Sequence, residues 1–405
     1  MSAIPLPESC NSDTLIQILH EHDVLNAGSE TVRFHVPGDC FITCGALTYL
    51  ATWGQRVLRN GGEIQFSGAE DPRRYLSRMN LFEHLDVPYE EDFQRRDETG
   101  RFTPIRLIED DEDVGPTTNA ILELVLRQFE NARDFIPALE WVIYETVDNI
   151  RLHAYTAVPG AVCAQYFPTR HRLDVAICDL GQGISGSLEH HLDPWEGSGD
   201  AIKMALQRGV TRDQEIGQGN GLPGAVEIAE ENEGEFRIWT DEVVYEIEDG
   251  EEKGFQQRPA VDGTGVVVRF DTTNPVHLSD TFMGRPTWTY IDSEVQRLSK
   301  EGSLKVAEDC LNTGTREPAK RLRRKVQSLL PDMDGPLALD FDGVDSASSS
   351  FLDELLGRLV DELGQETFNQ NIRLVNMPDE MVDMANVVIG QRVDSDGSES
   401  FTHLE

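Results

Sequence analysis

The sequence predicts a mixed α/β (α+β) protein that is divided into three folded regions. Its 405 residues exceed what one hydrophobic core accommodates, since single cores stop growing at about 250–300 residues. In every part of the chain, segments with helical spacing of apolar residues alternate with short β-branched and aromatic runs. Such alternation is typical of folds that pack helices against sheets.

The first region, residues 1–116, is expected to form a small α/β unit. Its expected elements are helix Leu15–Leu25, strand Thr31–Pro37, helix Ala46–Leu58, strand Glu63–Phe66 and a helical segment over Asp71–Leu85, in which Tyr75, Met79 and Phe82 repeat at helical spacing. The acidic run Glu109–Asp113 is followed by glycine and proline, which indicates a boundary loop.

The second region, residues 117–276, is expected to hold two helices and then several strands. A helix is predicted over Ile121–Phe129, and Pro137 suits the first turn of the next helix, which continues through Ile150. The expected strands are Ala161–Phe167, Leu173–Cys178, Phe236–Trp239 and Gly265–Phe270. The polar segment Asp241–Gln257 is either a hairpin or a long loop.

A connector over residues 277–300 leads to the third region, residues 301–392, which again alternates helices and strands. Its expected elements are helix Ala319–Leu329, strand Pro336–Phe341, a serine-rich turn, helix Phe351–Leu363 and strand Ile372–Val375. The acidic tail, residues 393–405, is expected to be disordered, as exposed chain ends often are.

The composition excludes several classes of partner. With 35 basic and 73 acidic residues the formal charge is −38, which argues against non-specific binding to nucleic acid or to anionic membranes. The acid excess suits a salt-rich, halophilic cytoplasm, although an ordinary acidic protein is the alternative. The six scattered cysteines imply no disulfide framework, and no signal peptide or membrane span is visible. We therefore expect a soluble, cytoplasmic protein.

Three short motifs, taken in order, point to a nucleotide with its metal. In the helix before Ile150, Glu145, Asn149 and His153 lie four apart and form a ridge beside the buried stripe of Leu139, Ile143, Thr146 and Ile150. An asparagine oxygen is a suitable ligand for hydrated Mg²⁺. Glu145 is one turn away and could activate water or a hydroxyl group, with Asp148 in support.

The second and third motifs are glycine-rich. Asp179 follows a buried strand and could accept a hydrogen bond from an exocyclic amine such as that of adenine. The candidate loop glycines are Gly181, Gly183, Gly217, Gly219 and Gly221. The last three precede a helical run, whose N-terminal backbone N–H groups could hold phosphates. Thr264, in the run DGTG, could contact the base edge through water.

Over residues 117–276 these motifs resemble the GHKL ATPases, which include gyrase, MutL and sensor histidine kinases. The resemblance implies a two-layer α/β sandwich that binds ATP and Mg²⁺. It implies that Glu145 is the general base, Asn149 the Mg²⁺ ligand, Asp179 the adenine anchor and Thr264 part of the last motif. It also implies a mobile lid over Ser187–Ile216, whose candidate phosphate contacts are Lys203, Arg208 and Arg212.

Residues 335–363 resemble STAS-like domains, the fold of anti-sigma-factor antagonists, and the first region resembles a divergent one. Ser348, Ser349 and Ser350 lie at the turn where these antagonists are phosphorylated, but no aspartate directly precedes them and Phe351 replaces a usual glycine. Helix capping is the alternative role for these serines. The basic run Lys320–Lys325 either contacts an acidic partner or balances nearby acidic residues.

The resemblances imply an ATP-binding regulatory protein that acts through STAS-like contacts, as a Mg²⁺-dependent ATPase or a serine kinase. The alternatives are an ATP-driven conformational switch or scaffold without kinase activity and a binding module with a degenerate site. The expected partner is a STAS-like or regulatory protein, and a homodimer is a further possibility. A sensor histidine kinase is disfavoured because no phosphoacceptor helix is present, and DNA enzymes are disfavoured by the charge.

Overall fold

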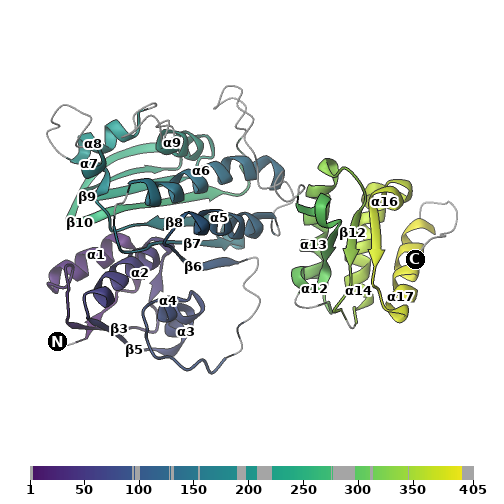
Figure 1. Cartoon of the computed structure of the whole chain (residues 1–405), viewed down its shortest axis with the longest axis horizontal. Helices are drawn as coiled ribbons and strands as arrows, with labels where there is room; N and C mark the ends of the chain where they lie inside the picture. The colour runs from purple at the N-terminus through teal and green to yellow at the C-terminus, as the bar shows by residue number, and fades with distance from the viewer. Residues whose placement is uncertain are drawn as a thin grey trace. The chain divides into compact units, whose positions relative to one another are not determined.

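The computed structural model shows two compact units of mixed α/β architecture, which confirms the predicted fold class (Figure 1). One unit comprises Met1–Leu124 and Pro137–Arg285, and the other comprises Val125–Ile136 and Pro286–Glu405. The structure describes residues 3–93, 95, 101–126, 128, 132–153, 156–188, 198–207, 221–274, 276, 297–310, 313–344 and 346–394.

The N-terminal layer, residues 3–93, is built on a parallel sheet with strand order β1-β3-β5. Its strands are β1 (Ile4–Pro5), β3 (Thr31–Val36) and β5 (Glu63–Gly68), with a second parallel pair formed by β2 (Ser9–Cys10) and β4 (Phe41–Ile42). Its helices are α1 (Ser12–Glu21), α2 (Cys44–Arg59), α3 (Glu70–Arg78) and α4 (Leu81–His84). The helical spacing of Asp71–Leu85 is confirmed, but the helix breaks at Asn80, which has a left-handed backbone (φ 61°).

Local sequence explains these elements. In β3, Val32, Phe34 and Val36 are buried whereas Arg33 and His35 are exposed, so only one face of this sheet joins the core. Helix α1 begins at a capping box in which the Asn11 side chain and the Thr14 side chain each bond the other residue's backbone N–H. The Thr43 side chain caps α2 by accepting a single hydrogen bond from the helix backbone.

The central sheet has five strands in the order β6-β7-β8-β10-β9, and all neighbours are antiparallel. The strands are β6 (Phe102–Ile108), β7 (Gly160–Phe167), β8 (Arg172–Cys178), β9 (Glu235–Glu248) and β10 (Glu251–Asp271). The helices of this region are α5 (Asp111–Leu126), α6 (Ala132–His153), α7 (Gly183–Leu188), α8 (Ser198–Ala205) and α9 (Gly221–Glu231). The four predicted strands are confirmed.

Of the two alternatives for Asp241–Gln257, the hairpin is confirmed. Strands β9 and β10 meet at Asp249-Gly250, where both residues have positive φ angles of 53° and 71°. This dipeptide is a strong sequence signal for a tight hairpin turn. In this long hairpin, β10 returns alongside β8. Residues of β10 therefore lie beside the end of β8.

Two expectations for the connecting segments are wrong. The acidic run Glu109–Asp113 is not a boundary loop, because α5 begins at Asp111 and the Asp113 carboxylate accepts hydrogen bonds from the backbone of Glu109 and Asp110. Acidic groups stabilise a helix N-terminus. Pro137 does not lie in a first turn either, since α6 already begins at Ala132.

Helix α2 lies between the two sheets of this unit (Figure 1). One side contacts β5, and the other contacts β7, β8 and β10. One buried cluster therefore contains Phe34 and Trp53 of the N-terminal layer together with Cys163, Cys178 and Trp239 of the central sheet. All six cysteines of the chain are free, in agreement with the expectation of no disulfide framework.

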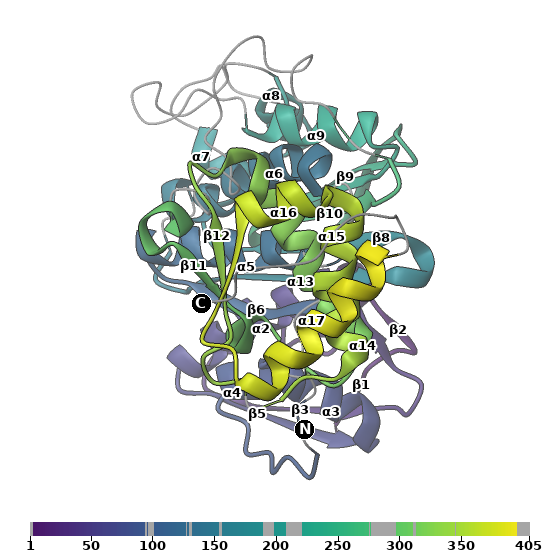
Figure 2. The same cartoon turned by 90° about the vertical axis from the view of Figure 1, so that its right-hand side faces the viewer.

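The C-terminal unit has three parallel strands in the order β11-β12-β13. They are β11 (Ser303–Lys305), β12 (Leu337–Asp340) and β13 (Ile372–Val375). Its helices are α12 (Val306–Asp309), α13 (Arg316–Leu329), α14 (Ser349–Leu352), a π-helical turn (Asp353–Gly357), α15 (Arg358–Leu363), α16 (Gln365–Asn371) and α17 (Asp379–Asp394). Figure 2 shows α17 beside α15. The predicted elements are confirmed, α17 was not predicted, and the tail beyond Asp394 lies outside the described residues.

The N-terminal layer and the C-terminal unit share one topology. In each, three parallel strands lie in sequential order, and a helix follows each strand before the next begins. The helix that follows the middle strand is capped by a hydroxyl side chain in both cases, Thr43 at α2 and Ser348 at α14. The expectation that the first region is STAS-like stays a prediction.

Candidate functional site

The site is organised around Asp179, which directly follows the buried strand β8. The residue is 8% exposed. Its Oδ1 accepts a hydrogen bond from the Gly181 backbone N–H at 2.7 Å, and its own N–H donates to the Thr264 carbonyl oxygen at 2.9 Å. Burial raises the pKa of this carboxyl group to about 7, although backbone hydrogen bonds from Gly181 and Thr264 oppose the shift. No cation among the described residues offsets this burial, so a hydrogen-bond donor would stabilise the ionised form.

Asp179 is enclosed by two segments that pack closely, the part of β10 that contains Gly263 and the loop that contains Gly183. Gly263 has φ +81°, and a β-carbon there would lie 2.1 Å from the Asp179 carbonyl oxygen. Thr240 joins the segments, since its hydroxyl donates to the Gly263 carbonyl at 3.0 Å and accepts from the Ile184 N–H at 3.1 Å. Gly183, in the predicted loop, packs against the same Thr240 hydroxyl.

Sequence reasoning assigned no role to Thr240. A buried threonine in a strand has the pattern of an ordinary β residue, and no sequence signal distinguishes it. Gly263 lies in the DGTG run beside Thr264, and the motif predicts no separate role for it. The structure therefore adds both residues to the frame that holds Asp179, Gly181, Gly183 and Thr264 together.

Helix α6 brings the second group of predicted residues to the same end of the sheet. The predicted buried stripe is confirmed for Leu139, Ile143, Thr146 and Ile150. Ile150 packs on Gly160 at the start of β7, where a β-carbon would also lie 3.2 Å from the Cys178 carbonyl oxygen. The turn of α6 that carries Asn149 therefore lies near the end of β8, from which Asp179 follows.

Glu145 lies against the start of α9. A β-carbon at Gly221, the first residue of α9, would be 2.6 Å from the Glu145 Oε2 atom. Glu145 and Gly221 therefore lie side by side although they are 76 positions apart in the sequence. Glu145 and Asn149 are both half-buried, which leaves them accessible to a ligand.

Other predicted residues contribute less or are not described. Lys203 on α8 is paired with Asp200 at 3.6 Å, and its ammonium group lies 5.1 Å from the Phe255 ring centre. The predicted residues Gly217, Gly219, Arg208 and Arg212 and the side chains of Asp148 and His153 lie outside the described residues. The expected lid is described only at residues 187–188 and 198–207.

A metal at this site would find few protein ligands among the described residues. Within the described ranges, no group of three or more histidine, cysteine, aspartate or glutamate side chains is arranged to hold a metal ion. Mg²⁺ is usually bound by one or two protein oxygens, water and substrate phosphates. The amide oxygen of Asn149 is a ligand of the kind that this mode of binding uses.

In the C-terminal unit, the serine turn is a helix cap. The Ser348 hydroxyl accepts from the Phe351 N–H at 3.0 Å and lies 2.9 Å from the Ser350 hydroxyl. The capping role is therefore confirmed for Ser348. Ser349 is exposed at the first position of α14.

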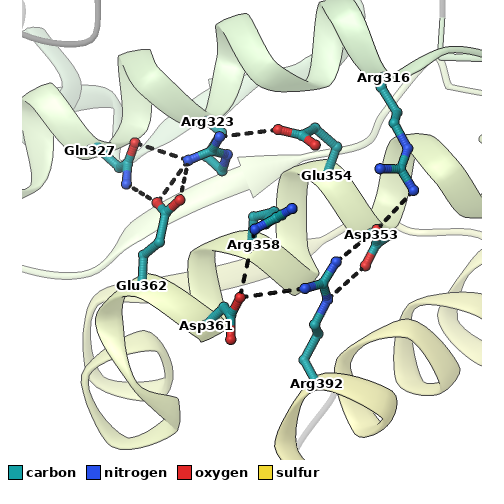
Figure 3. Close-up of polar contacts among 9 residues, drawn as sticks. All are labelled: Arg316, Arg323, Gln327, Asp353, Glu354, Arg358, Asp361, Glu362 and Arg392. Carbon is teal, nitrogen blue, oxygen red and sulfur yellow. Dashed lines mark hydrogen bonds and ion pairs between the residues drawn. The ribbon is translucent and has the colours of Figure 1, made fainter. Parts of the chain in front are cut away.

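Ion pairs connect the helices of the C-terminal unit (Figure 3). Arg323 on α13 pairs with Glu354 at 3.0 Å and with Glu362 at 2.6 Å. Arg392 on α17 binds both carboxylate oxygens of Asp353, at 3.0 and 3.1 Å. The nearly buried Lys325 pairs with Asp309 at 3.3 Å. For Arg323 and Lys325, the interpretation that the basic run balances nearby acid is confirmed.

We expect Arg323→Ala to destabilise these helices by about 2–3 kcal/mol, because it leaves the nearly buried Glu354 without its cation. Hydrogen exchange of the full chain should show about 30- to 100-fold faster exchange over α13–α15. The control is Arg358→Ala, whose side chain is 42% exposed and 3.9 Å from Asp361, and which should change stability by about 0.5 kcal/mol or less. Equal rates of hydrogen exchange over α13–α15 in both variants would contradict the conclusion that the Arg323 pair stabilises these helices.

Comparison with known proteins identifies one part of the chain. Residues 318–381 match the family described as a STAS-like domain of unknown function (DUF4325). No curated protein matches the chain. None of the described helices is both long and apolar enough to cross a membrane. The match begins in α13 and ends in the first turn of α17, so the C-terminal unit contains a STAS-like domain.

Proposed function

We propose that this chain is a regulatory protein whose central sheet binds ATP with Mg²⁺ and whose STAS-like domain carries the output. The observation that supports it best is Asp179, a buried carboxylate with no cationic partner among the described residues, framed by Gly181 and Thr264. An adenine amino group is a donor of the right kind for such a carboxylate. The raised pKa of Asp179 is expected for a carboxylate in a buried site, because burial disfavours its charged form.

The other residues fit the remaining parts of the ligand. Asn149 would hold Mg²⁺, which when bound neutralises phosphate charge. Gly221 begins α9, whose N-terminal N–H groups can bind phosphate oxygens. Glu145, which contacts this helix start, would orient or deprotonate the attacking hydroxyl group or water.

The proposal predicts the pH dependence of binding. The carboxyl group of Asp179 has a pKa of about 7 in the free protein, and its ionised form accepts a hydrogen bond from adenine more strongly than its protonated form does. Affinity should therefore rise with pH up to about pH 7 and level off above it. Calorimetry with adenosine avoids titration of the phosphates. An affinity for adenosine that does not change between pH 5.5 and 8.5 would contradict the role of Asp179.

Two outputs of ATP binding can be separated. As a serine kinase, the protein would transfer the γ-phosphoryl group to a serine hydroxyl, for which exposed Ser349 is a candidate. As a conformational switch, it would bind ATP without modifying the STAS-like domain. The use of the Ser348 hydroxyl as a helix cap favours the switch for that serine, because a phosphorylated residue would lose the present cap geometry.

Phosphate transfer with radiolabelled ATP distinguishes these outputs. We expect Asn149→Ala to remove any Mg²⁺-dependent labelling or hydrolysis, because the variant loses the proposed protein ligand of the metal. Labelling of serine in the wild type and not in the variant would establish the kinase. ATP binding with no labelled serine would exclude the kinase and leave the switch.

A further inference from the structure

The N-terminal layer contacts the loop that frames Asp179. Strand β10 has an irregular register between Val261 and Thr264, and we call Asp262–Thr264 the β10 bulge. The bulge touches Asp179 through Gly263 and through the bond to the Thr264 carbonyl. Its first residue, Asp262, instead bonds Arg56 of α2, with Nη1 and Oδ2 2.7 Å apart. The bulge therefore connects the candidate base site to the N-terminal layer.

The Arg56 side chain is fixed by contacts within the N-terminal layer. Its side chain is 17% exposed, and a second guanidinium nitrogen donates to the Leu25 carbonyl oxygen. That carbonyl also accepts from the Trp53 indole N–H at 3.0 Å, and Trp53 is fully buried in the core of the layer. A planar guanidinium fixed at two points transmits position better than a flexible ammonium group does.

Helix α2 also supports the strands that carry the site. The Thr52 hydroxyl lies 3.7 Å from the Cys178 sulfur, one residue before Asp179. Gly45 leaves no spare room against Val267 of β10, since a β-carbon would be 2.9 Å from that side chain. A shift of α2 would therefore reach both β8 and β10, because packed interiors transmit displacement.

We propose that Arg56 is a positioning residue for the nucleotide base, through which the state of the N-terminal layer sets the affinity for ATP. This inference rests on the proposed nucleotide site and adds a regulatory contact to it. Arg56 would act through Asp262 and the β10 bulge, and it would not touch the ligand. A displacement of α2 would loosen the bulge around Asp179 and weaken adenine binding.

The test is ATP binding to the full chain, measured by calorimetry with MgCl₂. We expect Arg56→Ala and Asp262→Ala each to raise the Kd about 3- to 10-fold, and the double variant to show no further loss. The exchanged pair, Arg56→Asp with Asp262→Arg, should recover part of the affinity. The thermal midpoint should change little in Asp262→Ala, because the Asp262 side chain is 63% exposed.

A matched control and a second readout identify a purely structural effect. Arg74→Ala removes an arginine of the same layer that pairs with Glu70 and Asp92, and it should leave the Kd unchanged. In Arg56→Ala, the midpoint of the pH profile for adenosine should move upward, because a loosened bulge supports the Asp179 carboxylate less well.

The outcomes separate this inference from the proposed function. Wild-type binding of ATP with an unchanged Kd and pH midpoint in Arg56→Ala would overturn the inference and leave the site intact. An equal loss in Arg56→Ala and Arg74→Ala would also overturn it, because it would show a general effect on the layer. Failure of the wild-type protein to bind ATP would refute the site itself and, with it, the inference.

Discussion

Asp179→Asn should abolish detectable ATP binding and at the same time make the folded protein more stable at neutral pH. Asparagine keeps an oxygen that can accept the bond from Gly181, but its amide can present N–H groups to the donor of adenine. A buried unpaired donor costs about 1–3 kcal/mol, and a site built for a hydrogen bond can reject a mismatched partner by more. We expect a loss of affinity of at least about 100-fold by calorimetry.

The gain in stability follows from the pKa. The folded state raises the pKa of Asp179 from 3.8 to about 7, so it binds this proton more tightly than the unfolded state does. Stability is therefore lost as pH rises from about 4 to about 7, and the deficit is complete above pH 7. Asp179→Asn removes that deficit and should stabilise the central region by about 1–3 kcal/mol at pH 8, with little effect at pH 4.

Asp174→Asn is a matched control in the same strand. Asp174 is also buried, at 3% exposure, but it pairs with Arg172 at 2.7 Å and with Arg269 at 3.5 Å. Its replacement leaves two arginines with a weaker partner and should reduce stability without affecting ATP binding directly. If Asp179→Asn is the less stable of the two at pH 8, or still binds ATP, the assignment of Asp179 is wrong.

Gly263→Ala should have the largest effect on folding among the glycine substitutions considered. The residue has φ +81°, and a β-carbon would lie 2.1 Å from the Asp179 carbonyl oxygen and 2.6 Å from the Leu180 α-carbon. Backbone atoms cannot yield as a side chain can, so the bulge must move. We expect a loss of about 3–4 kcal/mol in urea unfolding of the first unit, together with loss of ATP binding.

Gly254→Ala is a control that separates the clash of a β-carbon with neighbouring atoms from the strain of a left-handed backbone. Gly254 lies in the same strand with φ +84°, but a β-carbon there meets nothing within 4 Å. This variant should lose only about 1 kcal/mol, the cost of a left-handed backbone for alanine. A similar loss in both variants would show that contact between Gly263 and Asp179 does not constrain the bulge.

The sequence was most informative where burial and spacing act locally. The run Leu173–Cys178 predicted β8 because every residue of a central strand can be buried, and the four-residue spacing of α6 placed Glu145 beside Asn149. Both patterns depend only on neighbouring residues. They needed no knowledge of which elements later meet in space.

Contacts between distant elements could not be predicted in this way. Arg56 and Asp262 are 206 positions apart, and nothing in either local pattern marks one as the partner of the other. Thr240 resembles any buried strand residue. Helix α17 was missed because its apolar residues are not confined to one face: Ala385 and Val388 are buried, whereas Met384 and Val387 remain exposed.

The acidic run Glu109–Asp113 shows how composition can mislead. Clustered acidic residues are common in loops, but the same residues stabilise a helix start when their carboxylates accept backbone N–H groups. The two outcomes differ in backbone geometry and not in residue type. A prediction from composition alone could not separate them.

The most direct test of the account is calorimetric titration of the full chain with ATP and MgCl₂ at pH 8, at both low and molar salt. We predict one saturable site that is present in the wild type and Asp174→Asn and absent in Asp179→Asn. No heat of binding in the wild type at either salt concentration, with the chain folded by circular dichroism, would contradict the proposal that the central sheet holds ATP.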